Sequence, residues 1–109
     1  MNEYVAFLHE VFRKFGEIKT RKMFGGYGVY HQGVMFALVA DEELYLKVDQ
    51  ETVDQFLASS LDAFEYHKNG KQFKMSYHKA PDEIFDDPDI AQYWANLGFE
   101  AALRSAAKK

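Results

Sequence analysis

The side chains best suited to chemistry lie between residues 19 and 30, where cations are mixed with aromatic rings. They are Lys19, Arg21, Lys22, Phe24, Tyr27 and Tyr30. Cations neutralise phosphates, and exposed aromatic rings stack on bases or anchor a protein partner. The first interpretation is that Phe24 and Tyr30 belong to the core and the cations border a helix-to-strand turn. The functional interpretation is a binding surface, for a protein first and nucleic acid second, because arginine and aromatic residues are enriched in protein interfaces.

Three glycines, Gly25, Gly26 and Gly28, interrupt the same run. Glycine weakens a strand, and within one it usually marks a bulge or a close approach to the backbone. A phosphate-binding loop is not indicated, because no Gly-Lys-Ser/Thr follows and the next residues are typical of a strand. We therefore expect a bulged or sharply bent strand. The candidate interaction patch, called the 19–28 patch below, comprises Lys19, Arg21, Lys22, Phe24, Gly25, Gly26, Tyr27 and Gly28.

Other reactive side chains do not form a recognisable catalytic or metal-binding pattern. The four histidines, at positions 9, 31, 67 and 78, lack the spacing of known ligand motifs, so we expect surface imidazoles at strand ends. Ser76 and His78 share one face of a strand, but their Cα atoms would lie ~6.5 Å apart and no nucleophile-elbow sequence accompanies them. We therefore predict no catalytic residue, no metal site and no cofactor.

Composition narrows the class of protein. The chain has 109 residues, which suits one domain over residues 1–109, and 17% of them are aromatic, which is ample for a core. It has no cysteine and a net charge of -4, so nothing requires an oxidising compartment and a strongly basic nucleic-acid coat protein is excluded. No signal peptide or membrane-length apolar stretch is present, so we expect a cytoplasmic protein without a membrane partner.

Periodicity predicts the elements that would position the patch. Residues 3–15 fit an amphipathic helix, and strands follow from about residue 20, with a two-residue hairpin turn at Gln32-Gly33. Residues 34–40 are apolar on both faces, as in a strand covered on each side or by a partner. Asp49 is expected to cap a short helix over 50–59, with Val53, Phe56 and Leu57 facing inward.

The second half of the chain contains the clearest turn. Asn69-Gly70 predicts a two-residue hairpin that pairs residue 68 with 71, 66 with 73, 65 with 74 and 64 with 75. Asp87 is a suitable N-cap and Pro88 a suitable first residue for the last helix. That helix is expected to bury Ile90, Trp94, Leu97 and Ala101.

These elements predict an α+β fold in the order α-β-β-β-β-α-β-β-α. We expect a two-layer arrangement, with an antiparallel sheet of about five or six strands and helices mainly on one face.

The run Phe24-Gly25-Gly26-Tyr27-Gly28, together with residues 44–48, Gly70-Lys71 and 75–77, resembles the N-terminal domain of the TfoX (Sxy) family. The resemblance extends from about Arg13 to Arg104. That family is associated with regulating genetic competence in bacteria. The resemblance implies a non-enzymatic regulatory or binding module with the same kind of architecture, in a fold shared with some secretion chaperones that pair into dimers. Full-length members carry a second, helical domain, so we expect a single-domain relative.

We therefore predict a regulatory module that acts through protein–protein contacts. A homodimer and direct DNA contact are the alternative modes of binding. The alternative functions are a dimeric chaperone-like adaptor and, after it, a small-ligand-binding protein or an uncharacterised enzyme with a site between the glycine-rich strand and a helix.

Overall fold

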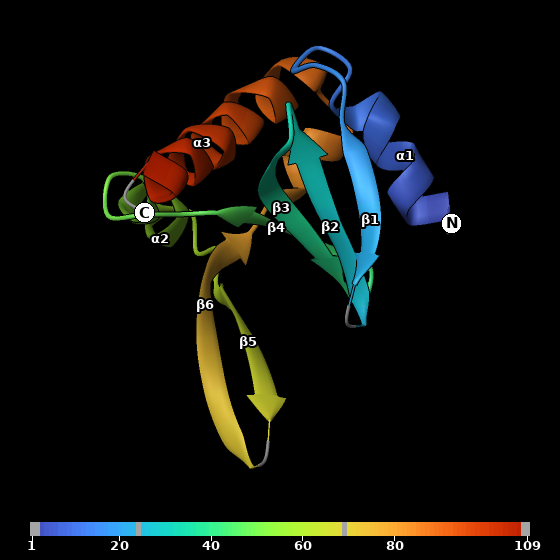
Figure 1. The fold of residues 1–109 in the computed structure, drawn as a ribbon. Helices are drawn as coiled ribbons and strands as arrows, with labels where there is room; N and C mark the ends of the chain where they lie inside the picture. Colours follow the sequence, from blue (N-terminus) through green and yellow to red (C-terminus); the bar gives the residue numbers. More distant parts are fainter. Residues whose placement is uncertain (1–2, 24, 69, 108–109) are drawn as a thin grey trace.

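The computed structural model of the chain describes residues 3–23, 25–68 and 70–107, and it describes the backbone alone for residues 66–68 and 71–75. Within these described residues, three α-helices, one short 3₁₀-helix and six strands follow one another in the predicted order (Figure 1). The elements are α1 (Glu3–Val11), β1 (Lys19–Met23), β2 (Gly26–His31), β3 (Val34–Ala40), β4 (Glu43–Lys47), α2 (Val53–Ala58), β5 (Ala63–Lys68), β6 (Lys71–Lys79), the 3₁₀-helix η1 (Asp82–Phe85) and α3 (Pro88–Ala107).

One antiparallel sheet contains all six strands, in the spatial order β1-β2-β3-β4-β6-β5. The first four strands form a meander in which consecutive strands are separated by two residues. Two of these turns have left-handed backbone at both positions: Gln32 and Gly33 have φ of 51° and 80°, and Asp41 and Glu42 have φ of 51° and 57°. This geometry matches the twist of the flanking strands and confirms the hairpin predicted at Gln32-Gly33.

All the helices pack against the same face of this sheet. The core cluster joins Leu8 of α1, Phe56 of α2 and Ala95 of α3 to Val29 and Leu46, which lie on one face of β2 and β4. Figure 1 shows α3 lying across one face of the sheet, with α1 and α2 beside it. The two-layer α+β architecture predicted from the sequence is therefore confirmed. No helix in the described residues is long and apolar enough to cross a membrane.

Two helices are shorter than the sequence predicts. The first helix ends at Val11 instead of residue 15, and a turn follows in which the Gly16 N–H donates to the Phe12 carbonyl. The second begins at Val53, because Asp49 binds the N–H of Glu51 in the turn before it instead of capping the helix. Leu57, predicted to face inward, is 57% exposed, since so short a helix buries only the Phe56 side of its surface.

The last helix begins as predicted. The Asp87 carboxylate accepts the N–H groups of Asp89 and Ile90, and Pro88 is the first helical residue. Ala101 is fully buried as expected, whereas Ile90, Trp94 and Leu97 are only partly buried. Small residues lie closest to the sheet, and they are Ala91, Ala95, Gly98, Ala101 and Ala102.

The β5–β6 hairpin extends away from the helices (Figure 1). Its predicted register is confirmed from the 68–71 pair to the 65–74 pair. Beyond residue 65 the register shifts, so that Ala63 pairs with His78 and the predicted pairing of residues 64 and 75 is not formed. Only the last residues of β6, from Tyr77 to Lys79, pair with β4. Asn69 of the predicted turn lies outside the described residues.

Candidate interaction surface

The sheet divides the 19–28 patch between its two faces. Lys19 pairs with Tyr30 and Arg21 with Gly28, which places these residues on the face opposite the helices. Lys22 pairs with Tyr27 on the other face, where the Tyr27 ring packs against the core. The patch is therefore not one surface, because neighbouring residues of a strand point to opposite sides. Phe24 lies outside the described residues.

The face without helices is the larger candidate surface, and we call it the helix-free face. Its members alternate with residues that point to the helix side, along β1, β2, β3, β4 and β6. They are Lys19, Arg21, Met23, Gly28, Tyr30, Met35, Leu38, Tyr45, Lys47, Tyr77 and Lys79. One continuous row crosses the sheet through the pairs Arg21–Gly28, Gly28–Leu38, Leu38–Tyr45 and Tyr45–Lys79. Alternation within each predicted strand indicates which of its residues share a face, but the sequence does not show which strands are neighbours.

The part of this face formed by β1, β2 and β3 is apolar and rich in methionine. A Cβ atom added at Gly28 would lie 2.8 Å from Met23 Sδ and 3.2 Å from Met35 Sδ, so the missing side chain makes room for both sulfurs. Tyr30 borders the same space at 3.1 Å. Met23 is 41% exposed, and Tyr30 and Met35 are half-buried. This part of the sheet therefore presents flexible apolar side chains to solvent.

Two cations lie over tyrosine rings of the helix-free face. The Arg21 guanidinium carbon is 5.9 Å from the centre of the Tyr30 ring, and Lys47 Nζ is 5.2 Å from that of Tyr77. Such contacts keep the two cations close to the tyrosine rings. Burial, followed by the neighbouring Tyr30, raises the pKa of Tyr77, which is only 8% exposed. Burial and the Glu43 carboxylate also raise the pKa of Tyr45, against the opposing charge of Lys79.

Positive charge predominates on this face although the whole chain carries -4. Its cations are Lys19, Arg21, Lys47 and Lys79. Glu43 lies 3.6 Å from Lys79 and compensates the charge at that side of the sheet. Lys19 and Arg21, both exposed, therefore make the β1 side the more positive end of the helix-free face.

An open hollow of about 570 Å³ adjoins this positive end. Its lining comprises Glu17, Lys19, Thr20, Arg21, Tyr30, His31, Gln32 and Gly33. The His31 ring has Nδ1 2.7 Å from the Glu17 carbonyl oxygen, and its centroid lies 4.5 Å from that of the Phe15 ring at an interplanar angle of 47°. The hollow combines two cations and the Glu17 carboxylate with an aromatic wall, and this net positive lining suits an anionic or polar side chain.

The glycines of the 19–28 patch are explained by the backbone. A Cβ at Gly26 would lie 1.9 Å from the Val39 carbonyl oxygen, so β3 approaches β2 too closely for any side chain. Gly25 is in the turn between β1 and β2 with φ of +66° and has open space around it. The close approach expected in the glycine run is therefore confirmed at Gly26. The expected bulge does not lie at the glycines, because Gly26 and Gly28 pair in register with both neighbouring strands and the register shifts between Val29 and Tyr30. In the described residues β3, not a helix, follows this strand, so no helix N-terminus is placed to bind a phosphate there.

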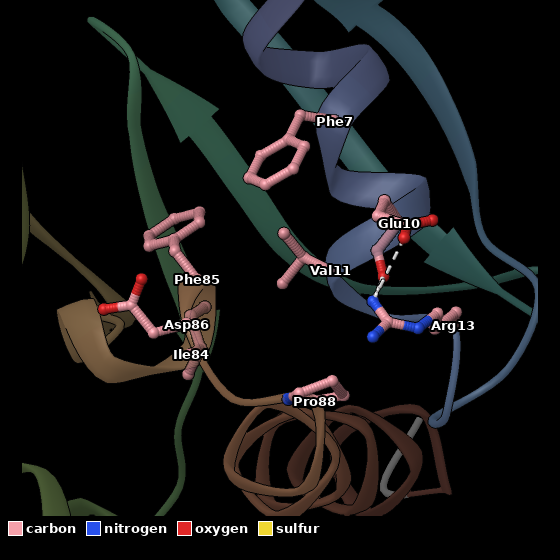
Figure 2. Close-up of a pocket in the computed structure, with 8 residues that line it drawn as sticks. All are labelled: Phe7, Glu10, Val11, Arg13, Ile84, Phe85, Asp86 and Pro88. Carbon is pink, nitrogen blue, oxygen red and sulfur yellow. Dashed lines mark hydrogen bonds and ion pairs between the residues drawn. The ribbon is translucent and has the colours of Figure 1, made fainter.

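A second hollow lies between α1 and η1 (Figure 2). Phe7 and Val11 face Ile84 and Phe85 across it, and its volume is about 90 Å³. Arg13 at its border is bound to Glu10 of the same helix turn. This space is large enough for a few water molecules, which makes it a packing gap rather than a ligand site.

The histidines expected at the surface are partly structural. The ring of His78 is buried, 7% exposed, and its Nδ1 lies 2.7 Å from the Leu61 carbonyl, so the expectation of a surface imidazole is wrong there. Ser76 instead accepts a hydrogen bond of 2.5 Å from Lys47. Within the described residues, no group of three or more histidine, aspartate or glutamate side chains is placed to hold a metal ion.

Comparison with known proteins identifies two relatives and a family. Protein Sxy of Escherichia coli (strain K12) is 23% identical over 107 residues, which is 98% of this chain and 48% of that protein. DNA transformation protein TfoX1 of Aliivibrio fischeri (strain ATCC 700601 / ES114) is 34% identical over 74 residues, or 68% of this chain and 35% of that protein. The chain thus spans about half or less of these relatives. The family model of the TfoX N-terminal domain matches residues 10–102, and the chain belongs to this family.

Proposed function

We propose that this domain is a non-enzymatic regulatory module that binds another protein through the helix-free face. The observation that carries the proposal is the composition of that face: exposed Met23 and half-buried Tyr30 and Met35, with Arg21 lying over the Tyr30 ring. Aromatic residues, methionine and arginine are the residue types enriched in protein interfaces. An apolar sheet face without a covering layer also gains free energy when a partner removes it from water.

The regulatory part of the proposal rests on the relatives. One is named as a DNA transformation protein, and the match to the TfoX N-terminal domain supports a regulatory role, so we assign this domain to the control of competence for DNA uptake. The proposal places it in the cytoplasm, and its composition without cysteine requires no oxidising compartment.

A chimera tests this function directly. The segment of TfoX1 that aligns with this chain is replaced by this domain, and transformation frequency is measured in Aliivibrio fischeri. We expect the chimera to support transformation and Tyr30→Ala to reduce it about tenfold or more, because a central interface residue is lost. Tyr93→Ala is the matched control, since Tyr93 is 51% exposed on α3, on the helix side of the sheet. A chimera that accumulates as folded protein without supporting transformation contradicts the proposal.

Direct DNA contact is the second candidate, favoured by the exposed cations Lys19, Arg21 and Lys22 of β1. Fluorescence anisotropy with labelled duplex DNA at two salt concentrations tests it. Binding that weakens with salt and is lost when the three cations become alanine supports DNA contact. We expect no such binding, because Lys22 lies on the opposite face from Lys19 and Arg21 and the whole chain is acidic.

A further inference from the structure

We infer that the partner segment bound by the helix-free face is acidic and partly apolar. A carboxylate of this segment enters the hollow between Lys19 and Arg21, and apolar side chains next to it cover Met23, Tyr30 and Met35. This inference rests on the proposed protein-binding function and specifies the chemistry of the partner.

Charge complementarity is the first step of the argument. Lys19 and Arg21 are two residues apart on one face of β1, so their Cα atoms are ~6.5 Å apart and both side chains reach one carboxylate. They line the same hollow of about 570 Å³, which is large enough for an aspartate or glutamate side chain with its water. Glu17 also lines this hollow, so two cations and one carboxylate leave a net positive charge there. Arginine supplies paired donors that match a carboxylate.

The apolar part of the face supplies the second step. Met23 and Met35 bring their sulfurs together above Gly28, directly beside the Arg21–Tyr30 contact. Methionine adapts its shape to irregular apolar surfaces, and burying such side chains provides binding free energy that charge alone does not. The partner therefore needs leucine, phenylalanine or similar residues next to its carboxylates.

The tyrosine rings argue against a single-stranded nucleic acid in this place. Bases stack on exposed ring faces. Here Arg21 lies over Tyr30, Lys47 lies over Tyr77, and Tyr77 is 8% exposed. The ion pair between Lys79 and Glu43 also interrupts the positive charge that a phosphate backbone would follow.

A second copy of the chain is also disfavoured. A two-fold interface brings the same patch of each copy together. Where the two-fold axis passes through the positive end, Lys19 and Arg21 of one copy would face the same cations of the other, and such like-charge contacts oppose association.

The test uses the whole chain and a fluorescein-labelled peptide of 12 residues in which aspartate and glutamate alternate with leucine and phenylalanine. A peptide with lysine in place of every acidic residue and a 12-nucleotide oligo-dT are measured beside it. We expect the acidic peptide to bind with a Kd of about 10–100 µM and to weaken as salt rises. Arg21→Glu is expected to weaken binding about tenfold or more, and Lys19→Glu to act in the same direction.

Lys22→Glu is the matched control, because it makes a similar charge change on the same strand but on the other face. It should alter the Kd by about twofold at most. Circular dichroism confirms that each variant is folded. Equal weakening by Arg21→Glu and Lys22→Glu, tighter binding of oligo-dT, or a dimer in analytical ultracentrifugation that excludes the peptide would each overturn the inference. Absence of peptide binding up to about 1 mM would also overturn it. If the chimera still depends on Tyr30 in that case, the proposed function stands and only the partner chemistry is wrong.

Discussion

Gly26 is the residue at which the backbone leaves least freedom, because the Val39 carbonyl lies where a Cβ atom would be. We expect Gly26→Ala to destabilise the protein by about 3 kcal/mol, since β2 and β3 must separate to admit the methyl group. Denaturant unfolding measures this difference. Gly25→Ala is the control: its surroundings are open and only its φ of +66° opposes a side chain, so we expect about 1 kcal/mol. Equal losses would show that turn conformation, not close approach, requires glycine in this run.

Asp49 joins the end of β4 to the last turns of α3. Its carboxylate accepts hydrogen bonds from Arg104 Nε at 2.6 Å and Nη2 at 3.1 Å, and these bonds lower the pKa of Asp49. The unfolded carboxyl has a pKa of about 4, so the stabilisation is present above that pH and is lost as the pH falls through the lower folded pKa. Asp49→Asn should lower the free energy of unfolding at pH 7 by about 1.5 kcal/mol.

Thermal or urea unfolding as a function of pH measures this effect. The difference between wild type and Asp49→Asn should shrink as the pH falls below about 4, where the unfolded carboxyl becomes protonated, and it should vanish below the lower pKa of the folded carboxyl. Asp54→Asn, at an exposed position of α2, is the control and should change stability by no more than about 0.5 kcal/mol at either pH. A pH-independent difference would mean that the Arg104 contact is not the source of the stabilisation.

For single residues, the sequence predicted why glycine is required in this run, but it did not predict to which face of the sheet each cation points. Glycine in a strand indicates close approach without further information, and Gly26 confirms it. Lys19 and Arg21 share a face with Tyr30, whereas Lys22 does not, and this follows from alternation once the strand boundaries are known. The sequence predicts a surface position for His78, because the contacts with Leu61 and Phe56 that bury it exist only in the folded chain.

The element that most depends on small side chains is α3. Ala95 is fully buried, and Gly98 brings the helix within reach of the β3 backbone, where its Cβ would lie 3.1 Å from the Phe36 carbonyl oxygen. We expect Ala95→Leu to destabilise the protein by about 3 kcal/mol, because the helix must move away from the sheet to admit the larger side chain. Chemical denaturation measures it. Asn96→Leu, on the exposed side of the same turn, should change stability by about 0.5 kcal/mol or less.

Element order and type could be predicted here, and element ends could not. Two-residue turns with glycine fix where strands stop, and Asp87-Pro88 fixes where α3 begins. The ends of α1 and α2 depend on tertiary contacts instead. Apolar spacing continues to Phe12 and Phe15, yet those rings reach the core from a turn. Their ring centroids lie 5.8 and 5.1 Å from the centroid of the Phe36 ring. Periodicity alone does not separate a turn that buries aromatic rings from another turn of helix.

For the whole molecule, stability should differ between its two parts. The β1–β4 meander is covered by helices, whereas the outer part of the β5–β6 hairpin pairs only with itself and extends from the body (Figure 1). A two-stranded hairpin is marginally stable alone. We expect backbone amides of residues 65–68 and 71–74 to exchange with deuterium at least about tenfold faster than those at the centre of β3. Uniform exchange would indicate that the hairpin opens only with the entire fold.

The two-residue turns of the meander also bear on how the chain reaches its native state. Three strand pairings are closed by loops of only two residues, at the pairs Met23–Gly26, His31–Val34 and Ala40–Glu43. Forming these pairings therefore costs little loop-closure entropy. The return of β6 to β4, which joins Lys47 to Tyr77, spans far more chain and is expected to be the slow step. During synthesis, the strands that carry most of the helix-free face emerge from the ribosome and can pair before α3 exists, so the surface proposed for partner binding assembles ahead of the core that later supports it.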